Sequence, residues 1–297
     1  MSDTEWRISM VHHASTEINP TIHCYNEYDN LKHVVVVSPD YMQIKEVINQ
    51  TQRHYLEENI NIDKAMEQHQ QFVQTLESQG TNVIKLVPKE ELNEQVFTRD
   101  IGFTIGNQFY LSTMEKEIRK PEVNVLRDWL EARKLPYNKI EGHSIEGGDV
   151  LIDNSIVWLG SSSRTSKKAM GILQKSLPDF EIKPIKFKDE LLHLDCVFNI
   201  ISEDTALIAS SGVDPESVAL LREHYDLIDV NEDEQFKMGT NVLSIGNKRV
   251  IALPENKRIN NELAKRGYKI LEVEFSEIIK SGGSFRCCSL PLERESN

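Results

Sequence analysis

The feature of this sequence that most constrains its fold is a recurring order of apolar strand, amphipathic helix and second strand. The pattern occurs five times, at 34–87, 109–142, 156–187, 205–230 and 249–273. Repeats of about 50 residues are typical of a ring or a solenoid rather than of two unrelated domains. We therefore expect an α/β fold built from pseudo-repeated strand–helix–strand units.

The last two copies carry the clearest signals for where each helix begins and ends. Asp214 is placed to cap the fourth helix, with Pro215 at its first position. In the fifth copy Leu263 and Ala264 are expected to face inward. Gly267 is a typical stop between that helix and the next strand.

The organisation of the chain points to one domain. No linker rich in Pro, Gly or Ser divides it, so we interpret 1–297 as a single α/β domain. The repeats are expected roughly at 26–96, 97–145, 146–192, 193–237 and 238–292. A closed ring of five units would bring equivalent ends of all units to one axis and form a central pocket there.

Charge and hydropathy narrow the possible partners. Asp plus Glu number 47 against 34 Lys plus Arg, a formal net charge of −13. Such a chain repels a phosphate backbone, so we expect no nucleic-acid partner and a mild preference for a cationic small molecule. No apolar run reaches the roughly 18 residues of a membrane span, and no signal-peptide core is present. We expect no membrane partner and a cytoplasmic location, and the sequence leaves a homo-oligomer open.

The cysteines argue against a zinc knuckle or a thioredoxin-like site. Cys24, Cys196, Cys287 and Cys288 form no CxxC pair. In a reducing cytosol they would be free thiols. We expect three of them to be inert and one to be a nucleophile.

Polar residues in apolar surroundings gather at the junctions between units. The junction segments are FTRD (97–100), HSIEGGD (143–149), HLD (193–195), MGTN (238–241) and SGGSFRCCS (281–289). They place acid, acid, imidazole with acid, amide and thiol at what we interpret as one corresponding position of successive units. This regularity is the strongest functional signal in the sequence.

Each segment alone has a structural explanation. An Asp at a strand start is usually a turn residue, Gly pairs form tight turns, and a single His or Cys is usually packed inside. Glu146, Asp149, His193 and Asp195 could be metal ligands, but they lack the spacing of known metal motifs, so we expect no metal. Structural roles do not explain why these groups share the junctions.

Together the junction residues suit chemistry on a flat cation. A thiol needs a nearby base or cation to become a thiolate, and a carboxylate behind an imidazole fixes its orientation. Two further carboxylates would bind a guanidinium through paired hydrogen bonds. The positive charge of that ligand would itself favour the thiolate.

The motifs FTRD, EGGDV, HLD and GG-SFR-C-CSLP, in this order, resemble those of the guanidine-modifying enzymes of the pentein fold. That superfamily includes arginine deiminases, dimethylarginine dimethylaminohydrolases and amidinotransferases. The resemblance covers nearly the whole chain and implies a five-bladed α/β propeller that needs no cofactor.

The resemblance also assigns roles to residues. It implies Cys287 as the nucleophile, His193 as the general acid and base, and Glu146 as the carboxylate that orients His193. Cys288 is expected to serve in packing.

Substrate-binding roles fall on a second group of residues. Asp100 and Asp195 are expected to hold the guanidinium, and Arg164 resembles an arginine that binds the substrate carboxylate in the deiminases. Asp149 and Asn241 are also expected to bind substrate. The dimethylarginine hydrolases usually have Lys where this chain has Asp195. The deiminases usually have an Arg shortly before the final Gly pair, where this chain has Lys280 and Ser281. The sequence therefore does not identify how the substrate carboxylate is bound.

The implied activity is hydrolysis of arginine or an N-omega-methylated arginine. A covalent thiouronium on Cys287 would break down to citrulline, with ammonia or an amine released. The alternative is an amidinotransferase that uses the same site. A pentein-fold protein that only binds a partner is a third possibility, but it would have no need of these groups together.

Overall fold

The computed structural model describes residues 19–296 and contains five three-stranded sheets. No helix within 19–296 has the length and apolar character needed to cross a membrane. The strands are β1 (Asn30–Val37), β2 (Asn82–Leu86), β3 (Gly102–Ile105), β4 (Gln108–Leu111), β5 (Asn138–Lys139), β6 (Val150–Asp153), β7 (Ile156–Ser161), β8 (Glu181–Lys186), β9 (Phe198–Ile200), β10 (Thr205–Ile208), β11 (Asp226–Asp229), β12 (Leu243–Ser244), β13 (Arg249–Ala252), β14 (Lys269–Glu272) and β15 (Leu290–Glu295).

The helices connect strands within and between these sheets. The α-helices are α1 (Gln50–Tyr55), α2 (Ile62–Ser78), α3 (Glu122–Ala132), α4 (Lys167–Ser176), α5 (Pro215–His224), α6 (Glu232–Phe236) and α7 (Lys257–Lys265). Six short 3-10 helices are η1 (Thr98–Ile101), η2 (Glu117–Arg119), η3 (Gly147–Asp149), η4 (Leu194–Cys196), η5 (Ser210–Gly212) and η6 (Ile278–Ser281).

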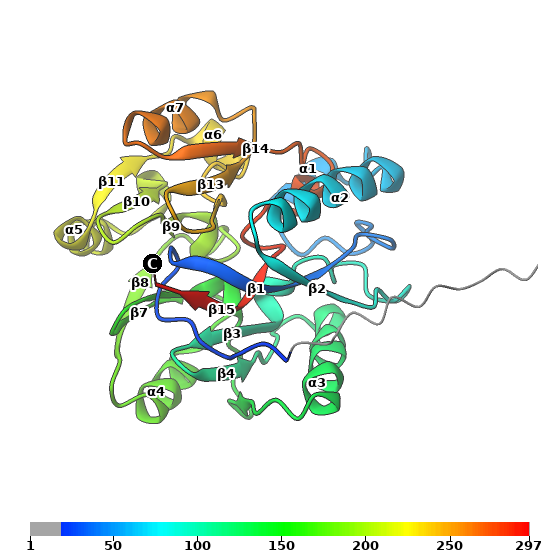
Figure 1. Ribbon diagram of the computed structural model, residues 1–297, viewed down its shortest axis with the longest axis horizontal. Helices are drawn as coiled ribbons and strands as arrows, with labels where there is room; N and C mark the ends of the chain where they lie inside the picture. Colours follow the sequence, from blue (N-terminus) through cyan, green and yellow to red (C-terminus); the bar gives the residue numbers. More distant parts are fainter. Residues whose placement is uncertain (1–18, 297) are drawn as a thin grey trace, which may run out of the picture.

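All five sheets share one design. A central strand pairs antiparallel with one neighbour and parallel with the other, as in β6-β7-β8, where β7 is central. A helix connects the central strand to its parallel partner, as the right-handed crossover of parallel strands requires. Figure 1 shows α2, α3, α4, α5 and α7 on the outside of the molecule, with the sheets inside. The predicted α/β fold is confirmed, and five small sheets are consistent with a propeller-like arrangement.

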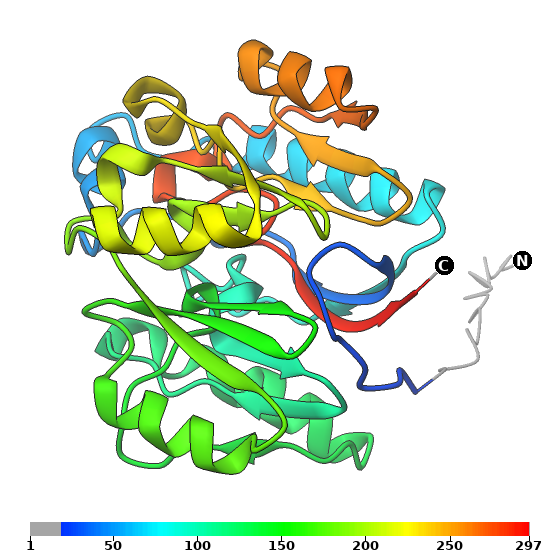
Figure 2. The same ribbon diagram turned by 90° about the vertical axis from the view of Figure 1, so that its left-hand side faces the viewer.

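The first sheet joins the two ends of the described chain. Its order is β15-β1-β2, so the last strand pairs with the first, with Val34 opposite Pro291 and Val35 opposite Leu290. Figures 1 and 2 show β15, in red, beside β1, in blue. Arg294 in β15 extends this link, because its guanidinium donates to the carbonyls of Asp29 and Ser244. The arrangement therefore closes through β15.

The helices follow from their capping residues and apolar spacing. The Asp214 side chain accepts from the backbone N–H of Glu216, and Pro215 opens α5, as expected. Gly267 has a φ of +85°, the left-handed conformation of a helix stop. Leu263 is fully buried, but the expectation for Ala264 is wrong: it is exposed, because α7 turns only a narrow stripe inward.

A tight turn precedes the antiparallel outer member of every sheet. In each turn the backbone N–H of the fourth residue donates to the carbonyl of the first. The five turns are Phe97–Asp100, Glu146–Asp149, His193–Cys196, Met238–Asn241 and Arg286–Ser289. η1, η3 and η4 contact one another in sequence, η1 with η3 and η3 with η4. The junction segments are thus five versions of one local structure.

Candidate active site

The equivalent turns correct one part of the sequence interpretation. The thiol, imidazole and acids do not share a single repeat position. Glu146 and His193 are first in their turns, Cys287 is second, Asp195 is third and Asp100 is fourth. The groups therefore come from different positions of equivalent turns.

All eight predicted site residues lie within the described chain and are at most 2% exposed. They fall into two groups joined by electrostatic contact, one around the Cys287 sulfur and one around the His193 ring. These residues are Asp100, Glu146, Asp149, Arg164, His193, Asp195, Asn241 and Cys287.

Asn241 holds the segment that carries Cys287. Its Oδ1 accepts from the backbone N–H groups of Ser284, at 3.0 Å, and of Cys287, at 3.1 Å. Its Nδ2 donates to the Cys287 sulfur at 3.1 Å and to the Asp195 carbonyl at 3.2 Å. The four hydrogen bonds of this amide are all made within the protein, so Asn241 fixes the position of the sulfur.

Asp195 is the carboxylate nearest to the Cys287 sulfur. Its Oδ2 lies 3.5 Å from Cys287 Sγ and 3.6 Å from Arg286 Nε. Burial raises the pKa of Asp195 despite the opposing charge of Arg286. A hydrogen bond with Cys196, burial and the charge of Asp195 together raise the pKa of Cys287 well above its usual value. The sulfur is therefore a neutral thiol at neutral pH.

His193 lies between two carboxylates. Its Nε2 is 2.7 Å from Glu146 Oε2, and its Nδ1 is 3.5 Å from Asp100 Oδ1. Burial alone would lower the pKa of His193, but the charge of Asp100 and the hydrogen bond with Glu146 raise it to about 10. Burial likewise opposes the charge of Glu146, yet the hydrogen bond from His193 lowers the Glu146 pKa to about 2. At neutral pH this pair is an imidazolium and a carboxylate.

Two polar atoms beside this pair have no hydrogen-bond partner. Asp100 Oδ1 and His193 Nδ1 are both buried and unpartnered among the described residues. They are 3.5 Å apart, too far for a good hydrogen bond. A buried acceptor and a buried donor left unpaired are costly and indicate a place where a polar ligand binds.

The Gly-Gly pair of EGGDV makes this arrangement possible. A Cβ at Gly147 would lie 2.1 Å from the carbonyl oxygen of Arg99, so only glycine lets η3 pack on η1. A Cβ at Gly148 would lie 2.7 Å from both Asp100 Oδ1 and His193 Nδ1. The two glycines thus keep the backbones close and the unpartnered atoms open.

Asp149 holds the backbone of the residue that follows His193. Its Oδ1 accepts from the backbone N–H of Leu194 at 2.9 Å, and its Oδ2 accepts from the Ser162 hydroxyl at 2.5 Å. Burial raises the pKa of Asp149 to about 6. Its contacts anchor the turn that presents His193.

Arg119 is a member of the site that sequence reasoning missed. Its Nη1 donates to Asp100 Oδ2 at 2.5 Å, and its Nη2 donates to Glu122 Oε2 at 2.8 Å. It is 2% exposed. In the sequence it stands in KEIRK, a charged run typical of an exposed segment, and no local signal predicts its burial. Arg119 fixes one oxygen of Asp100 and leaves the other unpartnered.

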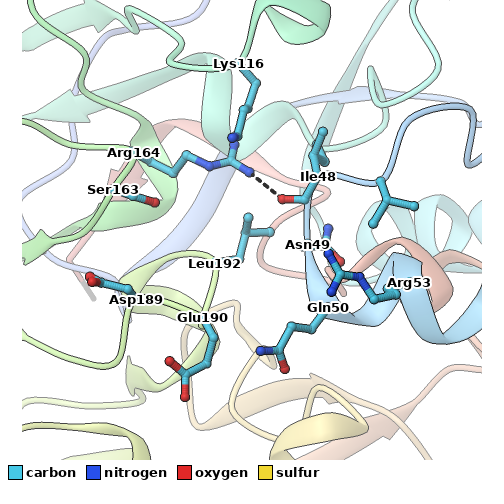
Figure 3. Close-up of a pocket in the computed structure, with 11 residues that line it drawn as sticks. Ile48, Asn49, Gln50, Arg53, Lys116, Ser163, Arg164, Asp189, Glu190 and Leu192 are labelled. Carbon is cyan, nitrogen blue, oxygen red and sulfur yellow. Dashed lines mark hydrogen bonds between the residues drawn. The ribbon is translucent and has the colours of Figure 1, made fainter.

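A cleft of about 400 Å³ lies outside the His193–Glu146 pair. Arg164 lines it, and the Arg164 Nη1 is 3.5 Å from Glu146 Oε2 while its Nη2 donates to the carbonyl of Ile48 at 3.1 Å. Figure 3 shows Lys116 and Arg164 on one side of this cleft and Asp189 and Glu190 on another. The cleft therefore offers both charge signs to a ligand that extends outward.

One group of residues in the described chain has the donor types and closeness of a metal site. The ligand atoms of Asp195, Cys196 and Cys287 lie within 4.8 Å of one another. Three donors are one fewer than a structural zinc site uses. The sequence predicts an inert Cys196, and its position beside Cys287 is a second feature that the sequence reasoning missed.

Sequence and structure comparisons connect this site to known proteins. Residues 38–294 match the family described as N,N dimethylarginine dimethylhydrolase, eukaryotic. The uncharacterised protein YkgA of Bacillus subtilis is 50% identical over 271 residues, which cover 91% of this chain and 95% of that protein. The N(G),N(G)-dimethylarginine dimethylaminohydrolase of Pseudomonas aeruginosa is 24% identical over 234 residues, 76% of this chain and 88% of that protein.

The fold has close counterparts among solved structures. The N-terminal domain of ArgZ, described as an arginine dihydrolase from cyanobacteria, matches with a TM-score of 0.82 at 23% identity. The match covers 90% of this chain and 98% of that domain. The resemblance seen in the junction motifs is thereby confirmed. The chain belongs to the N,N dimethylarginine dimethylhydrolase family, within the guanidine-modifying proteins of the pentein fold.

Proposed function

We propose that this protein is a cysteine-dependent hydrolase of arginine or of an N-omega-methylated arginine. The observation that carries the proposal is the pair of buried, unpartnered atoms, Asp100 Oδ1 and His193 Nδ1. The Cys287 thiol belongs to the same electrostatic environment, because the charges of Asp195 and Asp100 both raise its pKa. A guanidinium donates hydrogen bonds in a plane, so it would satisfy Asp100 and Asp195 at once.

The first half of the reaction begins when the cation binds. Its charge lowers the pKa of Cys287, so the thiol releases its proton to solvent while Asp195, 3.5 Å from the sulfur, stays a carboxylate that holds the guanidinium. The thiolate attacks the central guanidinium carbon. His193, protonated at neutral pH, gives its proton to the departing nitrogen, and a thiouronium remains on Cys287.

The second half regenerates the thiol. His193, now neutral, takes a proton from water as the water attacks the thiouronium carbon. The carbon–sulfur bond then breaks, the sulfur regains a proton from solvent, and a ureido product such as citrulline is released. Glu146 keeps the imidazole oriented in both halves through its 2.7 Å hydrogen bond.

The outer cleft supports an amino acid as the substrate. Lys116 and Arg164 would attract a carboxylate, while Asp189 and Glu190 would attract an ammonium group. Both groups are present at the far end of arginine. The kinship with a dimethylarginine dimethylaminohydrolase and the match to an arginine dihydrolase support the same substrate class.

Product analysis tests the proposal. The protein is incubated in ¹⁸O-labelled water with arginine, monomethylarginine, asymmetric dimethylarginine and agmatine, and products are identified by mass. We expect ¹⁸O-labelled citrulline from an arginine derivative, and slower turnover of agmatine, which lacks the carboxylate. Transfer of an unlabelled amidino group to an added amine would instead identify an amidinotransferase.

Two neighbouring cysteines provide the matched variants. Cys287→Ser should reduce turnover by at least about 1,000-fold with the fold retained, because the nucleophile is lost. Cys288→Ser should keep most of the activity and lower the thermal midpoint, because Cys288 is fully buried in an apolar cluster. Residual activity above a few per cent in Cys287→Ser would contradict the assignment.

A further inference from the structure

Cys196 has no task in the proposed reaction, yet it lies beside the nucleophile. Its sulfur, the Cys287 sulfur and an Asp195 oxygen are mutually within 4.8 Å. Each oxygen of the Asp195 carboxylate lies near one of the two sulfurs. Oδ1 is 3.6 Å from Cys196 Sγ, and Oδ2 is 3.5 Å from Cys287 Sγ. The two thiols therefore face one another across a single carboxylate.

Cys196 borders a small cavity that an oxidant of molecular size can enter. A cavity of about 50 Å³ is lined by Cys196 together with Leu192, Phe236 and Gly282. Its volume exceeds that of a single water molecule.

Two glycines precede the segment that carries Cys287. They are Gly282 and Gly283, and Gly282 has a φ of +97°. Closing a disulfide from this separation requires the sulfurs to approach to about 2.05 Å. Closure therefore requires the Cys287 sulfur to leave its hydrogen bond with Asn241 Nδ2.

We propose that Cys196 is a redox-modification site that locks the active site by forming a disulfide with Cys287. A hydroperoxide is the oxidant. The Cys196 sulfur attacks one peroxide oxygen, the O–O bond breaks, and Cys196 becomes a sulfenic acid while the peroxide leaves as an alcohol or water.

The Cys287 sulfur then attacks the Cys196 sulfur. The S–O bond breaks and water leaves with the thiol proton, so the two thiols together lose two electrons. An external dithiol reverses the disulfide by exchange. The loss of turnover rests on the proposed function, because it follows from the nucleophile being occupied, whereas the disulfide itself does not.

Peptide mapping after limited peroxide treatment tests the proposal. The full-length protein should lose two mass units and yield a cross-linked peptide pair containing Cys196 and Cys287. A dithiol should restore both the mass and the activity. Because the cross-link is read by mass, it is measurable even if no guanidine substrate is turned over.

Two variants complete the test. Cys196→Ser should give no cross-link and should lose activity at least tenfold more slowly under peroxide, relative to its own untreated rate. Cys288→Ser should still form the cross-link. Oxidation of Cys287 to sulfinic acid without a cross-link in wild-type protein, or a link from Cys287 to Cys288, would overturn the proposal. Stoichiometric binding of Zn²⁺ by the wild-type protein, together with no cross-link when metal-free protein is treated with peroxide, would also overturn it.

Discussion

A methyl group at position 148 would lie 2.7 Å from both Asp100 Oδ1 and His193 Nδ1. Gly148→Ala should therefore occupy the space between the two unpartnered atoms. We expect kcat to fall by about 100-fold or more, because displacements near 1 Å at a reacting centre have effects of that size. Steady-state kinetics on the best substrate from product analysis measures the loss.

Gly171 in α4 is the control for this substitution. A Cβ there would meet nothing within 4 Å. Gly171→Ala should keep wild-type kinetics and gain about 0.4–1 kcal/mol of stability, because alanine reduces the entropy of the unfolded chain. If Gly148→Ala were folded and as active as Gly171→Ala, the space beside Gly148 would not be where the substrate binds.

At this scale the sequence predicts some site residues and hides others. Asp100, His193 and Cys287 stand in short motifs at unit junctions, where polar side chains interrupt apolar strands. Arg119 is hidden because its burial depends on Asp100 and Glu122 closing around it, and its own segment is a charged run. An alignment of the five turns would have drawn attention to Cys196. It is the fourth residue of its turn, the position that Asp100, Asp149 and Asn241 have in theirs.

A buried network of hydrogen bonds holds the short helix α1 in place. Gln52 Nε2 donates to Glu94 Oε1 at 2.9 Å and to Ser281 Oγ at 2.7 Å. The Ser281 hydroxyl lies 2.9 Å from Glu94 Oε2. This network ties α1 to η6, directly before the glycines that lead to Cys287.

The network predicts a dependence of stability on pH. Burial raises the pKa of Glu94 from 4.5 to about 8. Between these values the folded chain retains a proton that the unfolded chain has released, so the Glu94 contribution to the free energy of unfolding decreases as pH rises. Glu94→Gln should remove this decrease, and urea denaturation from pH 5 to pH 8 measures it.

Glu77→Gln, at the exposed end of α2, serves as the control for Glu94→Gln. Its stability should follow the wild-type profile across the same range, because Glu77 is 49% exposed. A wild-type profile in Glu94→Gln as well would mean that Glu94 is ionised in the folded protein.

The sequence predicts which segments are helices and strands better than it predicts which side chains of a helix are buried. Apolar spacing gives the helix at 63–78, and the structure has α2 at Ile62–Ser78. Ala264 was placed on the buried face of α7 and is exposed, because a nine-residue helix that rests on one sheet buries few positions. The 3-10 turns carry no periodicity and emerge only from their shared hydrogen bond.

The molecule as a whole is closed by β15, and Arg294 tests how much that closure contributes. The buried guanidinium of Arg294 donates to the carbonyls of Asp29, at 2.7 Å, and Ser244, at 2.9 Å. Arg294→Met should lower the free energy of unfolding by about 2–4 kcal/mol, because two buried carbonyls lose a charged donor. Urea denaturation measures the change.

Arg127→Met provides the comparison for Arg294→Met. Arg127 is 42% exposed and pairs with Asp128 on the surface of α3. Its loss should change stability by less than about 1 kcal/mol. Equal, small effects of the two substitutions would show that the bonds of Arg294 contribute little to holding β15 beside β1.

Five units are readable in the sequence because each repeats the same alternation of strand and helix. The pairing of β15 with β1 is not, because their residues are some 260 positions apart and neither strand carries a sign of its partner. The resemblance to a known fold implies that pairing, whereas the periodicity of the sequence does not. Local patterns thus predict the units, and only long-range contact joins them.

The pairing of the first strand with the last also affects protein synthesis. Cys287 is translated after every other site residue, and β1 gains its antiparallel partner only when β15 has left the ribosome. The site that we propose is therefore complete only when Cys287 has been added, and the first sheet only when β15 has followed.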